Sequence, residues 1–165
     1  MPMFRCSVPA ATLALGLIAA AAPAVAQNLP YGPNVTNEQA HKLVGAAIAE
    51  ARKQGFTMAV AVVDTAGTLV VYDKLDNTQT GSALVAQDKA VSAALFKRPT
   101  KAFQDVVASG PAGARVLSLR GANAVEGGLP IVVDGKIIGA IGVSGGTSDQ
   151  DGIVAKAGLD ALAPK

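Results

Sequence analysis

Three polar residues that lie close together in the sequence offer the clearest basis for chemistry: Lys89, Arg98 and Thr100. Lys89 and Arg98 are about 2.5 helical turns apart, so they do not share a helix face. Pro99 favours a bend that would bring Arg98 and Thr100 to the rim of a pocket, with Lys89 in its wall. Two cations and a hydroxyl in one pocket suit a ligand with an apolar body and one or two carboxylates.

Each of these residues also has a purely structural interpretation. Lys89 is on the apolar flank of its helix, where a lysine more often extends its ammonium group to water than serves a buried anion. Arg98 suits the negatively charged end of a helix, and Thr100 can cap the next helix. The sequence leaves both interpretations open.

Three glycines are expected beside this pocket. Gly127 and Gly128 open one expected strand and Gly145 follows another, and glycine lets a backbone approach a ligand closely. The stretch 144–147 precedes a helix and offers backbone N–H groups to an anion. It lacks the lysine of a phosphate loop, and two aspartates in the next helical turn would repel an anion. A tight strand-to-helix connection is therefore the simpler interpretation.

The remaining candidates for chemistry are three carboxylates and one imidazole. Glu126, Asp64 and Asp73 flank expected strands, but no spacing fixes them as a pair, so glycosidase-type chemistry is not supported. His41 is the only histidine, which excludes a zinc site built from His and Cys ligands. It falls at the border of an apolar helix face, where a structural role is the simpler interpretation and a heme or metal ligand is the alternative.

The composition indicates one globular domain behind a leader. The chain has 165 residues, half of them apolar, with 14 Lys and Arg against 12 Asp and Glu. A net charge of +2 and an aromatic content of 4% do not suggest a nucleic-acid binder, which needs a basic face and stacking platforms. The one cysteine excludes a disulfide framework.

Residues 1–26 have the pattern of a secretory signal peptide. Arg5 is followed by a small and apolar stretch that ends in Ala24-Val25-Ala26, before Gln27. The apolar part between the flanking prolines is shorter than the roughly 20 residues that a spanning helix needs. We therefore expect cleavage before Gln27, a periplasmic or secreted protein, and no membrane contact after signal removal.

The rest of the sequence predicts an α+β fold. An extended lead-in covers 27–35, and helical spacing of apolar residues covers 37–54, 81–97, 101–108 and 147–162. Strands are expected at 58–64, 69–75, 131–133 and 136–143, with a two-residue turn at Asp134-Gly135. Residues 113–123 are ambiguous and read as a short helix followed by the start of a strand. The order implies an antiparallel sheet of about five strands flanked by helices.

Several stretches make the sequence recognisable. They are Val60–Leu69, Lys89-Ala90, Arg98-Pro99-Thr100, Glu126–Gly135 and Ile138–Gly146. On these residues the chain resembles the GlcG/HbpS family, also called the heme-degrading domain family, and its GlcG branch most closely. The resemblance covers about 36–162, so we expect one domain of this family at 36–165, and it is most specific in the second hairpin with its Gly-Val-Ser-Gly-Gly ending.

The resemblance implies a fold similar to the PduO C-terminal domain and assembly into homo-oligomers. It also implies heme as a cofactor, since some members are exported heme binders, and HbpS is linked to heme-dependent redox sensing. GlcG is associated with glycolate metabolism. The family therefore suggests more than one activity and does not decide whether the chain is an enzyme.

The sequence departs from the commoner family pattern where a histidine is often found. The first hairpin turn has Gly67-Thr68 in place of Gly-His, and 74–77 reads Lys-Leu-Asp-Asn in place of Arg-Met-Asp-Gly. The possible donors for a heme iron are then Thr100, Tyr72, Tyr31, Met58 and the non-family His41. The resemblance to HbpS favours Thr100, with His41 as the fallback.

Three functions follow as hypotheses. The first is an exported heme-binding protein, with Lys89 or Arg98 near the propionates. The second is a binding, accessory or enzymatic protein for a small organic acid such as glycolate, held by Lys89, Arg98 and Glu126. The third is a structural or sensory homo-oligomer that acts through a sensor-protein partner. The leader favours the first and third, whereas the scarcity of histidine weighs mildly against the first.

Overall fold

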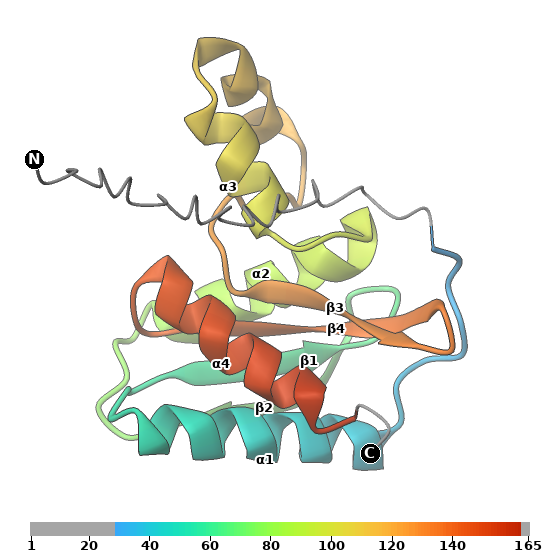
Figure 1. The fold of residues 1–165 in the computed structure, drawn as a ribbon, viewed down its shortest axis with the longest axis vertical. Coiled ribbons are helices and arrows are strands. Elements are labelled where there is room, and N and C mark those ends of the chain that lie inside the picture. Colours follow the sequence, from blue (N-terminus) through green and yellow to red (C-terminus); the bar gives the residue numbers. More distant parts are fainter. Residues whose placement is uncertain (1–28, 163–165) are drawn as a thin grey trace, which may run out of the picture.

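The computed structural model describes residues 29–162 (Figure 1). The expected signal peptide and the first residues of the lead-in lie outside the described residues. Within the described part, no helix is both long and apolar enough to cross a membrane.

A four-stranded antiparallel sheet forms the centre of the molecule. Its strands are β1 (Ala59–Val63), β2 (Leu69–Lys74), β3 (Gly128–Val133) and β4 (Lys136–Ser144), in the order β2-β1-β4-β3. The two hairpins expected from the sequence are β1–β2 and β3–β4, and the pairing of β1 with β4 joins them. The α+β class and the antiparallel sheet are therefore confirmed, with four strands rather than about five.

Helices cover both faces of this sheet (Figure 1). On one face lie α1 (Asn37–Lys53) and α4 (Ser148–Asp160), whose apolar residues pack on Val60, Val62 and Ile141. On the other face lies α2 (Ser82–Phe96), which packs on alternate residues of the same strands such as Ala61 and Ala140. The period-two alternation of the strands thus serves two different cores.

Local signals in the sequence set the element ends. Thr36 with Gln39 and Thr147 with Gln150 form the two expected capping boxes at the starts of α1 and α4. In the β3–β4 turn Asp134 has a φ of 49° and Gly135 a φ of 71°, as expected for a type I′ turn.

The contact between α2 and the sheet is unusually close because both surfaces are made of small residues. Seven alanines line it: Ala59, Ala61, Ala86, Ala90, Ala93, Ala94 and Ala140. A Cβ atom at Gly142 would collide with the backbone of Ala86 and Ala90. Gly142 of β4 therefore faces α2, and its missing side chain permits the close contact.

The ambiguous segment 113–123 contributes no strand. After α3 (Lys101–Ala108) the chain forms η1, a 3-10 helix at Pro111–Ser118, and then a loop. Gly113 packs against the backbone of Val106, where any Cβ would overlap the carbonyl group. This contact holds η1 to α3 and away from the sheet, so the expected fifth strand does not form.

Residues 97–125 project from the sheet as an arm (Figure 1). The arm begins at Lys97, which ends α2 in the left-handed conformation with a φ of 56°. It contains α3, η1 and the loop that returns to β3. Phe103 anchors it by an edge-to-face contact with Phe96, whose ring centre is 5.2 Å away.

The lead-in extends the sheet. Tyr31 forms an isolated parallel bridge with Ile137, and the backbone N–H of Gly32 donates to Ile137 O. This segment therefore covers β4 beyond the end of β1, which pairs no further than Val63 with Ala140.

Candidate functional site

Lys89 is fully enclosed. Its side chain is 1% exposed, and its Nζ donates to Asp151 Oδ2 at 2.7 Å and to the carbonyl oxygen of Val143 at 3.1 Å. The favoured expectation, an ammonium group that extends to water, is therefore wrong. The other interpretation, that Lys89 pairs with a buried anion, agrees with the structure. The anion is the carboxylate of Asp151 and not a ligand.

Asp151 also explains the glycine-rich turn after β4. Its Oδ1 accepts a hydrogen bond from the backbone N–H of Gly146, and the N–H of Gly145 faces the same carboxylate. The backbone donors that could have held an external anion are thus directed at an internal one. Burial raises the pKa of Asp151, and the hydrogen bonds from Lys89 and Gly146 offset part of that rise.

Thr100 fastens the base of the arm to the first residue of β3. Its Oγ1 accepts from the N–H of Gly128 at 2.9 Å, and its own N–H donates to Gly128 O at 3.0 Å. The side chain is fully buried. Thr100 occupies the position before α3, as expected, but its hydroxyl does not cap that helix.

Gly127 and Gly128 are required by these neighbours. A Cβ at Gly127 would lie 2.9 Å from Lys89 Nζ and 2.8 Å from Asp151 Cβ. A Cβ at Gly128 would overlap the carbonyl of Lys89 and lie 2.6 Å from Thr100 Cγ2. The structure therefore brings together five of the expected site residues: Lys89, Thr100, Gly127, Gly128 and, behind Asp151, Gly145.

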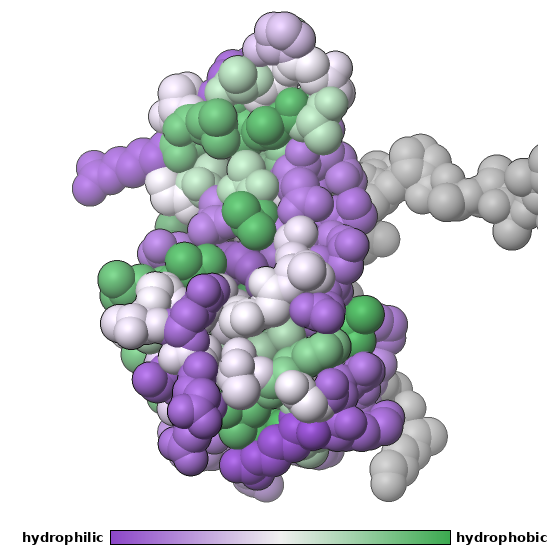
Figure 2. Space-filling model, turned by 90° about the vertical axis from the view of Figure 1, so that its left-hand side faces the viewer, coloured by the Kyte–Doolittle hydropathy of each residue, from purple (hydrophilic) through white to green (hydrophobic). Residues whose placement is uncertain are grey.

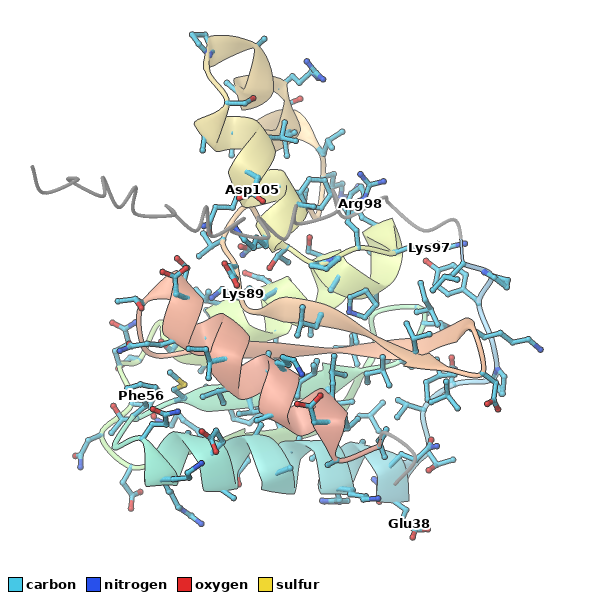
Figure 3. All side chains as sticks on the ribbon, in the orientation of Figure 1. Glu38, Phe56, Lys89, Lys97, Arg98 and Asp105 are labelled. Atoms are coloured by element: carbon cyan, nitrogen blue, oxygen red, sulfur yellow. The ribbon has the colours of Figure 1, made fainter. Side chains whose placement is uncertain are left out.

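Arg98 does not join this group. Its Nε donates to the carbonyl of Phe96, and its guanidinium lies over the ring of Phe103, 5.5 Å from the centre. Figure 3 shows Arg98 and Lys97 at the end of α2, apart from Lys89. The bend at Pro99 thus sets the two expected cations on separate sides of the arm's base.

Glu126 is the polar group at the outer side of this cluster. Its side chain is 18% exposed, yet Oε2 is buried and has no hydrogen-bond partner within the described residues. Lys101 Nζ lies 3.9 Å from that oxygen, and Gln104 accepts from the Glu126 N–H. Burial raises the pKa of Glu126, although Lys101 opposes the rise. Of the three carboxylates considered from the sequence, Glu126 is the one that adjoins this cluster.

The other oxygen, sulfur and nitrogen donors considered for a heme iron lie elsewhere. His41 is exposed on α1, at the edge of the buried helix face, and α1 lies on the sheet face opposite α2. Tyr31 donates its hydroxyl to Ala94 O, and Met58 is fully buried. Tyr72, on β2, has a buried hydroxyl without a partner in the described part of the chain. Burial raises the pKa of this phenol.

Sequence reasoning missed two members of the cluster. The sequence indicates Asp151 only as one of two aspartates in a first helical turn that would repel an anion, and it gives no role to Gln104. Their partners are 62 and 22 residues away, so no local pattern indicates them. The only available signal was the need of a lysine on an apolar face for an acidic partner.

The chain is similar to a known family along most of its length. A family model described as "Haem degrading protein HbpS-like" matches residues 35–160. Protein GlcG of Escherichia coli strain K12 is 38% identical over 110 residues, which is 67% of this chain and 81% of GlcG. The corrinoid adenosyltransferase PduO of Salmonella typhimurium is 32% identical over 124 residues, 74% of this chain but 37% of PduO.

Two solved structures share the fold. The crystal structure of HbpS has a TM-score of 0.72 at 30% identity and covers 83% of this chain and 96% of that one. The crystal structure of a PduOC:heme complex also has a TM-score of 0.72, at 28% identity over 78% of this chain and 95% of that one. These likenesses confirm the fold expected from the sequence and include a protein crystallised with heme.

Proposed function

The chain belongs to the HbpS-like heme-degrading family, and from this premise we propose that it is an exported heme-binding protein that acts in heme handling or redox sensing. The likeness to the PduOC:heme complex supports heme as the ligand. The leader pattern supports export to the periplasm or the medium. Bound heme would supply a redox-active iron whose properties depend on its axial ligand.

The chemistry of the donors decides which residue suits the iron. Thr100 was the donor expected from the resemblance, but its hydroxyl already accepts a hydrogen bond from Gly128. An iron bound there would share the oxygen with the Gly128 N–H donor. The Tyr72 hydroxyl has no such bond within residues 29–162, and it adjoins the alanine cluster under α2. A phenolate oxygen is an established heme ligand, so Tyr72 fits the group better than Thr100 does.

A small organic acid such as glycolate is the second candidate ligand. Lys89, the residue first expected to hold its carboxylate, is neutralised by Asp151. Of the two cations first expected to hold it, Arg98 remains, with a half-buried side chain at the base of the arm. Saturable glycolate binding that is lost in Arg98→Gln, with no response to hemin, would favour this alternative.

A hemin titration followed at the Soret band tests the proposal. We expect a saturable shift at one heme per subunit, and a wild-type protein with no saturable shift would refute heme binding. Tyr72→Phe removes only the hydroxyl, so it should weaken binding or change the spectrum while the fold is kept. Thr100→Ala and His41→Ala are the matched comparisons. If Thr100→Ala alone changes the spectrum of a folded protein, the ligand is the one expected from the resemblance.

A further inference from the structure

The arm returns to the sheet through a loop, residues 119–126, that two side chains hold in place. The N–H of Asn123 donates to Ser92 Oγ of α2 at 2.9 Å, and the N–H of Glu126 donates to Gln104 Oε1 of α3 at 2.8 Å. This return loop forms one wall of a cavity of about 250 Å³, and α2 forms another. The position of the return loop therefore decides how far the cavity is open.

The carboxyl group of Glu126 lies between α3 and the start of α4. Its Oε1 is so close to Gly152 of α4 that an added Cβ there would collide with it. Its Oε2 is buried and has no hydrogen-bond partner within residues 29–162. A neutral carboxyl group is tolerated in such a place, whereas a buried carboxylate oxygen without a donor is strongly unfavourable. The place that Glu126 occupies thus suits its protonated form.

The charged groups around Glu126 do not compensate a negative charge on it. Charged side chains face it from three helices: Lys101 and Asp105 of α3, Asp149 of α4 and Lys89 of α2. Lys101 Nζ is 3.9 Å from Oε2 but 2.8 Å from Asp105 Oδ1, and Lys89 is neutralised by Asp151 at 2.7 Å. Burial raises the pKa of Glu126 and the two aspartates add to the rise, although Lys101 and Lys89 oppose it.

An ionised Glu126 can reach water only by turning outward. Its side chain is already 18% exposed, and Lys101 beside it is 50% exposed. Figure 2 shows hydrophilic surface continuing from the arm, at the top, to the body below it. On one side of Glu126 the chain is fixed, because Gly128 is hydrogen-bonded to Thr100. The movement therefore falls on the return loop, on the other side.

We propose that the proton of Glu126 acts as a latch on the return loop. With the proton, the carboxyl group stays between α3 and α4, and the loop closes the cavity against α2. Without the proton, the carboxylate turns toward water and Lys101, the hydrogen bonds from Asn123 and Glu126 weaken, and the loop moves off α2. Access to the cavity thus increases as pH rises.

Amide hydrogen exchange of the return loop, measured by mass spectrometry on the whole protein, tests the latch. Comparing the wild type with Glu126→Gln at the same pH cancels the pH dependence of the exchange chemistry itself. We expect equal protection at about pH 4 and about fivefold weaker protection in the wild type at about pH 8. The matched control is Glu38→Gln, the same change at an exposed glutamate on α1, which should lose protection at high pH as the wild type does.

The midpoint of this change identifies the group that titrates. The carboxyl carbon of Glu126, followed by NMR, should titrate at the pH where the loop loses protection. Lys101→Met removes the nearest cation and should move the midpoint to higher pH, whereas Asp149→Asn removes a neighbouring negative charge and should move it to lower pH.

A return loop that is equally protected at both pH values in the wild type would overturn the inference. The same loss of protection in Glu126→Gln, or midpoints that move in the opposite directions, would also refute it. Circular dichroism of each variant establishes that it is folded. The measurement needs no heme, so the hemin titration and the exchange measurement can fail separately.

Discussion

Lys89 Nζ lies 2.7 Å from Asp151 Oδ2, and this contact joins two helices that cover opposite faces of the sheet. Lys89 comes from α2 and Asp151 from the first turn of α4. The bond passes beside Gly127, the residue before β3, which has no side chain to block it. The pair therefore holds the two layers together at one end of the sheet.

Loss of the lysine alone should destabilise the protein strongly. Lys89→Met leaves Asp151 buried without its counter-charge, and we expect the free energy of unfolding to fall by about 3–5 kcal/mol. Urea unfolding followed by circular dichroism measures this. The matched control is Lys156→Met on α4, whose pair with Asp160 is exposed and should contribute no more than about 0.5 kcal/mol. Combining Lys89→Met with Asp151→Asn should regain part of the loss, and no regain would contradict the interpretation.

The hydroxyl of Thr100 should matter more than its methyl group. Thr100→Val keeps the shape but leaves the Gly128 N–H without an acceptor, which should cost about 1–3 kcal/mol. Hydrogen exchange at the Gly128 amide should become faster in the same variant. Thr100→Ser keeps the acceptor and should protect that amide as the wild type does. Equal protection in the valine variant would mean that the bond does not hold the arm to β3.

The β3–β4 turn should not tolerate a β-branched residue. Gly135 has a φ of 71°, so Gly135→Val should destabilise the protein by about 1–3 kcal/mol through backbone strain. Gly45→Ala is the opposite case, since Gly45 is inside α1 and a Cβ there meets no atom within 4 Å. That change should stabilise the protein by about 0.5–1 kcal/mol. Thermal unfolding of both variants checks the contrast.

Glu126 should make stability depend on pH. Because burial raises its pKa, the folded protein keeps this proton at pH values where the unfolded chain has lost it. Stability therefore decreases as pH rises from the usual glutamate value through the raised one, and the cost is fully present only above the raised value. Glu126→Gln should stabilise the protein by about 1 kcal/mol at neutral pH, with the gain vanishing below about pH 4. A gain that is the same at both pH values would exclude the carboxylate as its cause.

The leader can be tested directly. We expect mass spectrometry of the native protein to show loss of residues 1–26 and a first residue of Gln27. Changing Ala24 and Ala26 to bulky residues should prevent that cleavage. An intact Met1 in the envelope fraction would contradict the signal-peptide interpretation.

Local features were predictable from the sequence because they depend on neighbouring residues. Both capping boxes need only residues three positions apart, and the Asp134-Gly135 turn needs only two. The ends of α3 were also predicted, since Pro99 and Gly110 limit it on either side.

The site was predictable only in part because its bonds connect distant elements. A helical wheel places Lys89 on an apolar flank but does not show that Asp151 lies opposite it. Thr100 has the right position for a helix cap, yet its φ and ψ are helical and its hydroxyl turns to Gly128 instead. The sequence placed Lys89, Thr100 and the glycines 127 and 128 in one neighbourhood, and the tertiary contacts decided what each one does.

The pairing of β1 with β4 has a consequence for how the chain comes to be folded. Ala59 in β1 lies opposite Ser144 in β4. The two central strands of the sheet therefore come from nearly opposite ends of the domain sequence. A polypeptide that emerges with its N-terminus first, from a ribosome or through a translocation pore, cannot close this sheet until β4 has also emerged. Contacts so far apart along the chain form slowly. The topology itself thus delays closure of the sheet until the last quarter of the chain is available.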